Sequence, residues 1–165
     1  MGRWGVGGLR SARCGRTYPA TLWSASFYCA HLARATVVGA AVREGDGYQL
    51  NPDDIGKRIT PRTKMIIVNS PHNPTGVVYT RETLEAVANI AAKHKLLVVS
   101  DENYERIRFD GQKHNSMPTF PQIAGQVNTV HGFPQAYAST GWRLGTVRLH
   151  PALTDRRTAR AGERV

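Results

Sequence analysis

The strongest structural constraint in this sequence is a pair of short apolar segments separated by one helix-like segment. Met65–Asn69 and Leu96–Ser100 stay apolar until their last residue, which is typical of strands covered on both faces. Between them Thr80 can cap a helix, and the apolar residues that follow it recur at helical spacing: Leu84, Val87, Ala88 and Ala91. A strand, a helix and a strand in this order favour a right-handed crossover between parallel strands. The sequence therefore predicts an α/β fold with a mostly parallel sheet and helices on both faces.

Weaker patterns predict further elements around this unit. Short strands are expected at Thr36–Val42, Val127–His131 and Gly145–Leu149. A weak apolar pattern favours a helix over Thr21–Ala35, and another helix is expected from Asn51 to Ile59, with a proline in its first turn. A chain of 165 residues is long enough to form one domain with a sizeable core.

The formal net charge of +10 is concentrated near the two ends of the chain. Residues 1–16 carry four arginines and no acidic residue, and residues 148–165 carry five arginines against two acidic residues. We therefore expect a disordered basic segment over residues 1–16, a folded domain over residues 17–153 and a basic tail over residues 154–165. Because the folded part carries little of this charge, we do not expect nucleic acid as a partner, although tails that bind an acidic surface stay an alternative to solvated tails.

The sequence also bears on membranes and on cysteine chemistry. The longest apolar stretch, Ala35–Val42, falls far short of the roughly 20 residues that span a bilayer, so no membrane association is expected. The first residues are basic and lack the apolar centre of a secretion signal, which favours a cytoplasmic protein. Cys14 and Cys29 lack metal-type spacing and are expected to be free thiols.

Three polar, turn-forming clusters follow the predicted strands. Asn69–Gly76 (NSPHNPTG) follows the first, Asp101–Tyr104 (DENY) follows the second, and Gly132–Gly145, which contains AYASTGWRLG, follows the third. Ligands of open parallel sheets bind outside the carboxyl ends of the strands. The three clusters are therefore expected to converge on one ligand-binding edge.

In this order and spacing, the three clusters resemble the large domain of fold-type I pyridoxal-phosphate enzymes, specifically the class I and II aminotransferases. The resemblance runs from about Tyr28 to Ala152, which is only the middle of what such enzymes usually contain. It implies a partial large domain that binds pyridoxal 5'-phosphate, non-covalently at best. It also implies small-molecule partners, an amino acid and a 2-oxo acid between which intact relatives transfer an amino group, and a possible homo-oligomer.

The resemblance assigns roles to individual residues. Asp101 matches the carboxylate that keeps the pyridine nitrogen of the cofactor protonated, and Asn73 and Tyr104 match donors to its phenolic oxygen. Arg143 matches the arginine that binds the phosphate, and Trp23 is a candidate for the aromatic residue that stacks on the ring. Each residue also has a structural alternative: a turn cap for Asp101, a turn residue for Asn73, a packing residue for Tyr104, a surface residue for Arg143 and a core residue for Trp23.

One position departs from the family pattern. Gln135 stands where the family has the lysine that forms the Schiff base with the cofactor and shuttles the substrate proton. An amide is neither a nucleophile nor a general base at neutral pH, and loss of the base step alone costs on the order of 10²–10⁴ in rate. We therefore expect no catalytic lysine and an inactive or strongly impaired aminotransferase. The alternatives are a non-catalytic phosphate-ligand-binding or regulatory protein that keeps the fold, and an anion-binding module that uses the basic ends.

Overall fold

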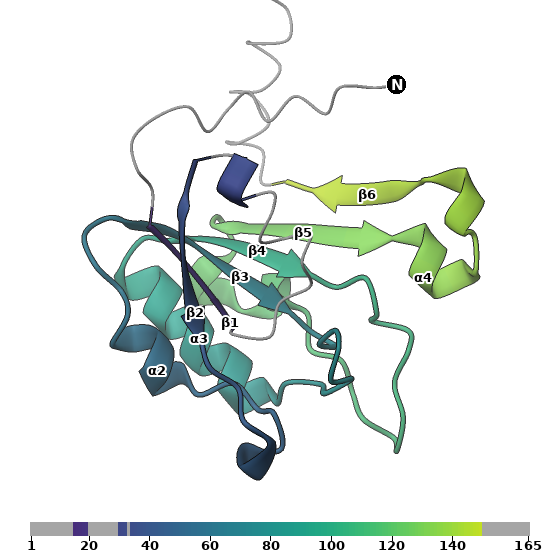
Figure 1. Ribbon diagram of the computed structural model, residues 1–165, viewed down its shortest axis with the longest axis horizontal. Helices are drawn as coiled ribbons and strands as arrows, with labels where there is room; N and C mark the ends of the chain where they lie inside the picture. Colours follow the sequence, from purple (N-terminus) through teal and green to yellow (C-terminus); the bar gives the residue numbers. More distant parts are fainter. Residues whose placement is uncertain (1–14, 20–29, 33, 150–165) are drawn as a thin grey trace, which may run out of the picture.

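The computed structural model describes residues 15–19, 30–32 and 34–149, which form one six-stranded sheet with the order β2-β1-β3-β4-β5-β6 (Figure 1). The strands are β1 (Gly15–Pro19), β2 (Thr36–Ala40), β3 (Thr63–Asn69), β4 (Leu97–Asp101), β5 (Val127–Gly132) and β6 (Gly145–Arg148). The α-helices are α2 (Pro52–Gly56), α3 (Arg81–Lys93) and α4 (Phe133–Tyr137), and the 3₁₀ turns are η1 (Glu44–Asp46), η2 (Met117–Thr119), η3 (Pro121–Ile123) and η4 (Thr140–Trp142). All neighbouring strands run parallel except β5 and β6, which are antiparallel. This confirms the α/β class and the mostly parallel sheet.

The predicted strand–helix–strand unit is β3, α3 and β4. The Thr80 hydroxyl accepts a hydrogen bond from the Thr83 backbone N–H at 3.2 Å and so caps α3, as the sequence predicts. The four predicted apolar residues of α3 are all buried. They pack on Ile66, Val68 and Val98 of the sheet, together with Phe120 and Ile123 from the segment before β5. Burial of each large apolar side chain stabilises the fold by roughly 1.5–3 kcal/mol, so this layer is the core.

The helices α2 and α3 belong to the same layer. Figure 1 shows α2 and α3 side by side on one face of the sheet. The Asn51 side chain caps α2 by accepting a hydrogen bond from the Asp53 N–H at 2.9 Å, and Ile55 joins the core. On the opposite face of the sheet, Leu97 and Val99 are half-buried. No helix in the described part of the chain is long and apolar enough to cross a membrane.

Several element boundaries differ from the sequence prediction. β1 is unpredicted, because its segment, GRTYP, has no apolar run, and it begins at Gly15, so two residues of the predicted basic N-terminal segment lie in a strand. β4 begins at Leu97 and extends to Asp101. α2 ends at Gly56, before the predicted end at Ile59. Most of the helix predicted over residues 21–35, and the predicted tail over residues 154–165, lie outside the described residues.

The last strand is the exposed edge of the sheet. All four residues of β6 are exposed, including Val147 at 53%. The short segments α4 and η4 that connect β5 to β6 contain no buried residue. Trp142, the last residue of η4, exposes 77% of its surface. The carboxyl end of β5 therefore lies beside an apolar region that the rest of the described chain leaves uncovered.

Candidate active site

The loops that follow β3 and β4 are joined at the carboxyl edge of the sheet by one buried asparagine. Asn69 pairs with Asp101 across the two strands, and its Nδ2 donates a hydrogen bond to the Asp101 carbonyl oxygen at 3.1 Å. Its Oδ1 accepts a hydrogen bond from the backbone N–H of Asn73 at 2.9 Å. Asn69 thus fixes the position of Asn73 relative to Asp101, and both are predicted site residues. The sequence analysis missed this role, although a polar residue at the end of an apolar strand signals it.

Two of the predicted cofactor residues contact each other directly. Asn73 Nδ2 donates a hydrogen bond to the Tyr104 hydroxyl oxygen at 2.8 Å, across 31 positions of sequence. Next to Asn73, His72 is buried and its Nδ1 lies 2.7 Å from the Thr75 hydroxyl. The NSPHNPTG loop is therefore held internally and also tied to the loop after β4.

Asp101 ends β4 in a largely desolvated position. Burial raises the pKa of its carboxyl group, and the nearby carboxylate of Glu102 raises it further. The Asn103 backbone N–H, which donates to Asp101 Oδ1 at 3.3 Å, and the neighbouring His131 act in the opposite direction without restoring the ordinary pKa. A buried carboxylate with few partners is costly, and a cationic ligand group beside it would lower that cost.

Asn73, Asp101 and Tyr104 form the Asn73–Tyr104 corner of the sheet edge. The two remaining predicted residues, Arg143 and Trp23, are not placed in this corner by the described structure. Arg143 is exposed, with its Nη1 donating to the Thr140 carbonyl oxygen at 3.3 Å, and it makes no hydrogen bond or ion pair with Asn73, Asp101 or Tyr104 in the described structure. Trp23 lies outside the described residues.

Gln135 is an exposed residue of α4, just beyond the end of β5. Its side-chain oxygen folds back over Gly132, so a Cβ at Gly132 would clash with it and with the side-chain oxygen of Asn103. The absence of a side chain at Gly132 therefore makes room for two amide groups at the end of β5. Gln135, one of these two amides, is the residue that the sequence analysis matches to the lysine of the family pattern.

A second polar cluster, which the sequence analysis missed, surrounds Glu102. Glu102 is only 1% exposed, and its Oε1 accepts hydrogen bonds from the Ser100 hydroxyl at 2.7 Å, the Ser116 hydroxyl at 2.9 Å and the Met117 N–H at 3.2 Å. Its Oε2 lies 2.9 Å from His114 Nε2. Burial alone would raise the pKa of Glu102, but the hydrogen bonds from His114, Ser100 and Ser116 and the charge of His114 outweigh it and hold the pKa below its ordinary value.

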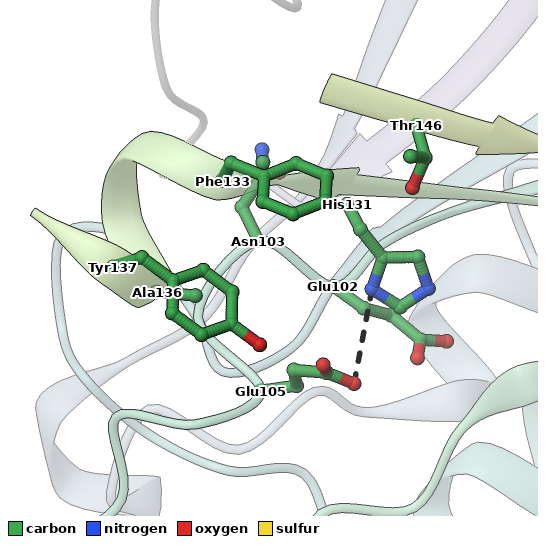
Figure 2. Close-up of a pocket in the computed structure, with 9 residues that line it drawn as sticks. Glu102, Asn103, Glu105, His131, Phe133, Ala136, Tyr137 and Thr146 are labelled. Carbon is green, nitrogen blue, oxygen red and sulfur yellow. Dashed lines mark ion pairs between the residues drawn. The ribbon is translucent and has the colours of Figure 1, made fainter. Parts of the chain in front are cut away.

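This cluster borders a pocket of about 230 Å³ between the ends of β4 and β5 and α4. Figure 2 shows the His131 imidazole facing the Glu105 carboxylate, with Glu102 beside this pair and Phe133 and Tyr137 on another wall of the pocket. Of the predicted cofactor residues that the structure describes, Asn73, Asp101, Tyr104 and Arg143, none lines this pocket. Two polar sites therefore adjoin at one edge of the sheet.

Comparison with known proteins decides the family. Residues 15–162 match the family described as aminotransferase class I and II. The chain belongs to this family. The aspartate aminotransferase of Pinus pinaster is 44% identical over 128 residues, which cover 77% of this chain and 26% of that protein. The aspartate aminotransferase of Pyrococcus abyssi is 41% identical over 116 residues, 70% of this chain and 30% of that one.

Solved aminotransferase structures share the fold. The aromatic aminotransferase from Pyrococcus horikoshii OT3 superposes with a TM-score of 0.82 at 34% identity, covering 85% of this chain and 38% of that one. A double mutant of Thermus thermophilus aspartate aminotransferase gives a TM-score of 0.78 at 35% identity, covering 84% and 36%. The resemblance to the aminotransferases is thereby confirmed, and the chain spans well under half the length of these relatives.

Pyridoxal phosphate is the cofactor that an aminotransferase implies, and the described residues fit one half of it. Asp101 offers a carboxylate without a cationic hydrogen-bond partner, suited to a protonated ring nitrogen. Asn73 and Tyr104 offer an amide and a hydroxyl side by side, suited to a ring oxygen. For the phosphate, the described structure offers no comparable cluster at this corner, because Arg143 is engaged elsewhere.

Proposed function

We propose that this aminotransferase chain is a pyridoxal-phosphate-binding part of a large domain that holds the cofactor non-covalently and has little or no transaminase activity of its own. The observation that supports this most is the hydrogen bond of 2.8 Å between Asn73 and Tyr104, which adjoins the half-buried Asp101 through Asn69. Intact aminotransferases act on an amino acid and a 2-oxo acid. These are the small-molecule partners we propose for the whole protein.

In this proposal each residue of the corner has one task. The Asp101 carboxylate would hold the ring nitrogen in its protonated form, because a positive neighbour lowers the cost of the buried negative charge. The Asn73 amide and the Tyr104 hydroxyl orient the ring through its oxygen substituent. When bound, pyridoxal phosphate supplies an electron sink for the reacting carbon of the substrate.

Gln135 limits the chemistry of the chain. Its amide cannot bond covalently to an aldehyde, and it cannot hold and release the substrate proton. The five lysines of the described chain all lie outside α4. Lys64 lies at the start of β3 and Lys95 just before β4, both at the amino edge of the sheet; Lys57 and Lys93 lie at the ends of α2 and α3, and Lys113 is exposed on the loop between β4 and η2. We therefore propose that no lysine of the described chain replaces the missing group.

Absorbance titration with pyridoxal phosphate tests this proposal. The unmodified chain should perturb the cofactor spectrum saturably, but borohydride treatment should leave no cofactor on the protein. Gln135→Lys should gain a stoichiometric borohydride-fixed cofactor at residue 135, whereas Gln112→Lys, which places a lysine on an exposed loop, should not. A borohydride-fixed cofactor on a lysine of the unmodified chain, or no spectral change at all, would overturn the proposal.

The phosphate-binding role of Arg143 stays a prediction, as does the stacking of Trp23 on the cofactor ring. Arg143→Ala should weaken binding by about 1.5–3 kcal/mol if the guanidinium reaches the phosphate, whereas Arg148→Ala, on exposed β6, should not. Equal affinities in titration calorimetry would remove Arg143 from the site.

The alternative of a non-catalytic phosphate-ligand-binding or regulatory protein is favoured by the same Gln135. It predicts that Gln135→Lys fixes the cofactor without yielding any amino-group transfer when an amino acid and a 2-oxo acid are added. The anion-binding alternative predicts binding to a polyanion that weakens steeply with salt. Homo-oligomer formation and a cytoplasmic location also stay predictions.

A further inference from the structure

We propose that Glu102, Glu105 and His114 form a binding site for a divalent transition-metal cation, with Zn²⁺ the best match to the donor set. The site lies beside the pocket between the ends of β4 and β5, separate from the Asn73–Tyr104 corner. It is independent of the proposed cofactor binding, because none of the proposed cofactor residues belongs to it.

The distances between the donor atoms suit one ion. One donor atom from each of the three residues lies within 4.8 Å of the others, and the Glu102 Oε2 and His114 Nε2 atoms are 2.9 Å apart. In tetrahedral coordination, ligands bound to one zinc ion at about 2.0–2.2 Å lie about 3.4 Å from one another, so a side-chain rotation has to bring the more distant donor closer by about 1 Å. Glu105, whose side chain is 36% exposed, has the freedom to make it.

The buried ligand is held in place by its own hydrogen bonds. Three donors, from Ser100, Ser116 and Met117, all bond to Oε1 of Glu102 and leave Oε2 directed at His114. Carboxylates that bind metals are characteristically anchored by such outer hydrogen bonds. His114 is itself nine-tenths buried, and its one hydrogen bond in the described structure is directed into this cluster through Nε2.

The charge and the donor types select the class of ion. The two carboxylates carry two negative charges, which a dication balances, and an imidazole binds a metal ion through a nitrogen that carries no proton. One nitrogen and two oxygen donors match zinc and its first-row neighbours better than Mg²⁺ or Ca²⁺, which take oxygen ligands. His131 and Glu105 both line the pocket, and His131 Nδ1 lies 3.7 Å from Glu105 Oε2. A water molecule from this pocket would complete the coordination of the ion.

Calorimetric titration of the full, chelator-stripped and reduced chain with zinc chloride tests the site. We expect one zinc per chain and at least about tenfold weaker binding in Glu105→Gln, because loss of even an outer partner of a metal ligand costs about 10–100-fold. The matched control is Glu85→Gln, which changes an exposed glutamate on α3 and should bind as the unmodified chain does. Absence of saturable binding, or equal affinity of Glu105→Gln and the control, would overturn the proposal.

A second measurement separates this site from the two cysteines. Cobalt in place of zinc should give visible absorption bands without the near-ultraviolet charge-transfer band of a thiolate ligand. His114→Asn should lose these bands and His94→Asn, at the exposed end of α3, should keep them, with circular dichroism confirming that both variants fold. If His114→Asn does not fold, the bands are followed in Glu105→Gln. A thiolate band, or unchanged bands in a folded His114→Asn or in Glu105→Gln, would assign the metal to other residues and refute the site.

Discussion

Glu102→Gln is the substitution that most directly tests how the carboxyl edge is held together. The change keeps the size and shape of the side chain and removes only the charge and one acceptor. In the structure the carboxylate accepts four hydrogen bonds while only 1% exposed. The amide keeps an oxygen for the three donors at Oε1, but it turns an NH₂ group toward His114 Nε2. The imidazole must then change tautomer or lose its partner.

The expected loss in the free energy of unfolding follows from the kinds of hydrogen bond that the substitution weakens. A hydrogen bond to a charged group contributes about 1.5–3 kcal/mol and a neutral one about 0.5–1.5 kcal/mol, so each bond loses about 1 kcal/mol. Four bonds would lose about 4 kcal/mol, and release of a buried charge returns part of that. We therefore expect a net loss of about 2 kcal/mol in the free energy of unfolding, which lowers the melting temperature by about 4–8 °C for a chain of this size.

The assay is thermal and urea unfolding of both proteins in the presence of a metal chelator, with Glu85→Gln as the control for loss of a surface charge. Because the pKa of Glu102 is lowered in the folded state, its contribution is complete above the ordinary value of 4.5 and is lost as pH falls through the folded pKa. The difference between the proteins should therefore shrink below pH 4.5. A difference at pH 7 no larger than that of the control, or one that does not change with pH, would refute the reasoning.

Four other predictions follow from single features. Tyr79→Phe should raise the free energy of unfolding by about 1 kcal/mol in urea titration, because the Tyr79 hydroxyl is buried without a hydrogen-bond partner among the described residues. Gly132→Ala should lower it by about 1–3 kcal/mol in the same assay, because the new methyl group meets two amide oxygens. Asp101→Asn should weaken pyridoxal-phosphate binding and raise the melting temperature at pH 7. Because burial raises the pKa of Asp101 in the folded state, this gain in stability should vanish below pH 3.8. Val147→Lys should reduce self-association measured by light scattering, since β6 is an exposed apolar edge.

The central part of the fold could be predicted because its sequence pattern is local. The apolar segments that became β3 and β4, and the helical spacing of α3, each require only a few neighbouring residues to be recognised. β1 could not be predicted this way. Its segment GRTYP contains no apolar run, and its strand character comes from pairing with β2 and β3 on either side. Pairing between distant segments overrides weak local preference in such cases.

The candidate cofactor site could be predicted only where its residues lie in loops that carry a sequence motif. Asn73 and Tyr104 were placed by motif and lie in contact, whereas the exposed position of Arg143 depends on the backbone of η4, where its φ of 51° is left-handed. The pairing of Glu102 with His114 joins residues 12 positions apart across an irregular segment. No period of helix or strand would reveal it.

The two sites have a common origin in the alternation of a β-strand. Successive side chains at a strand end point to opposite faces of the sheet, so Asp101 and Glu102 are neighbours in sequence but belong to different polar clusters. Their charges also act on each other, since the Glu102 carboxylate contributes to the raised pKa of Asp101.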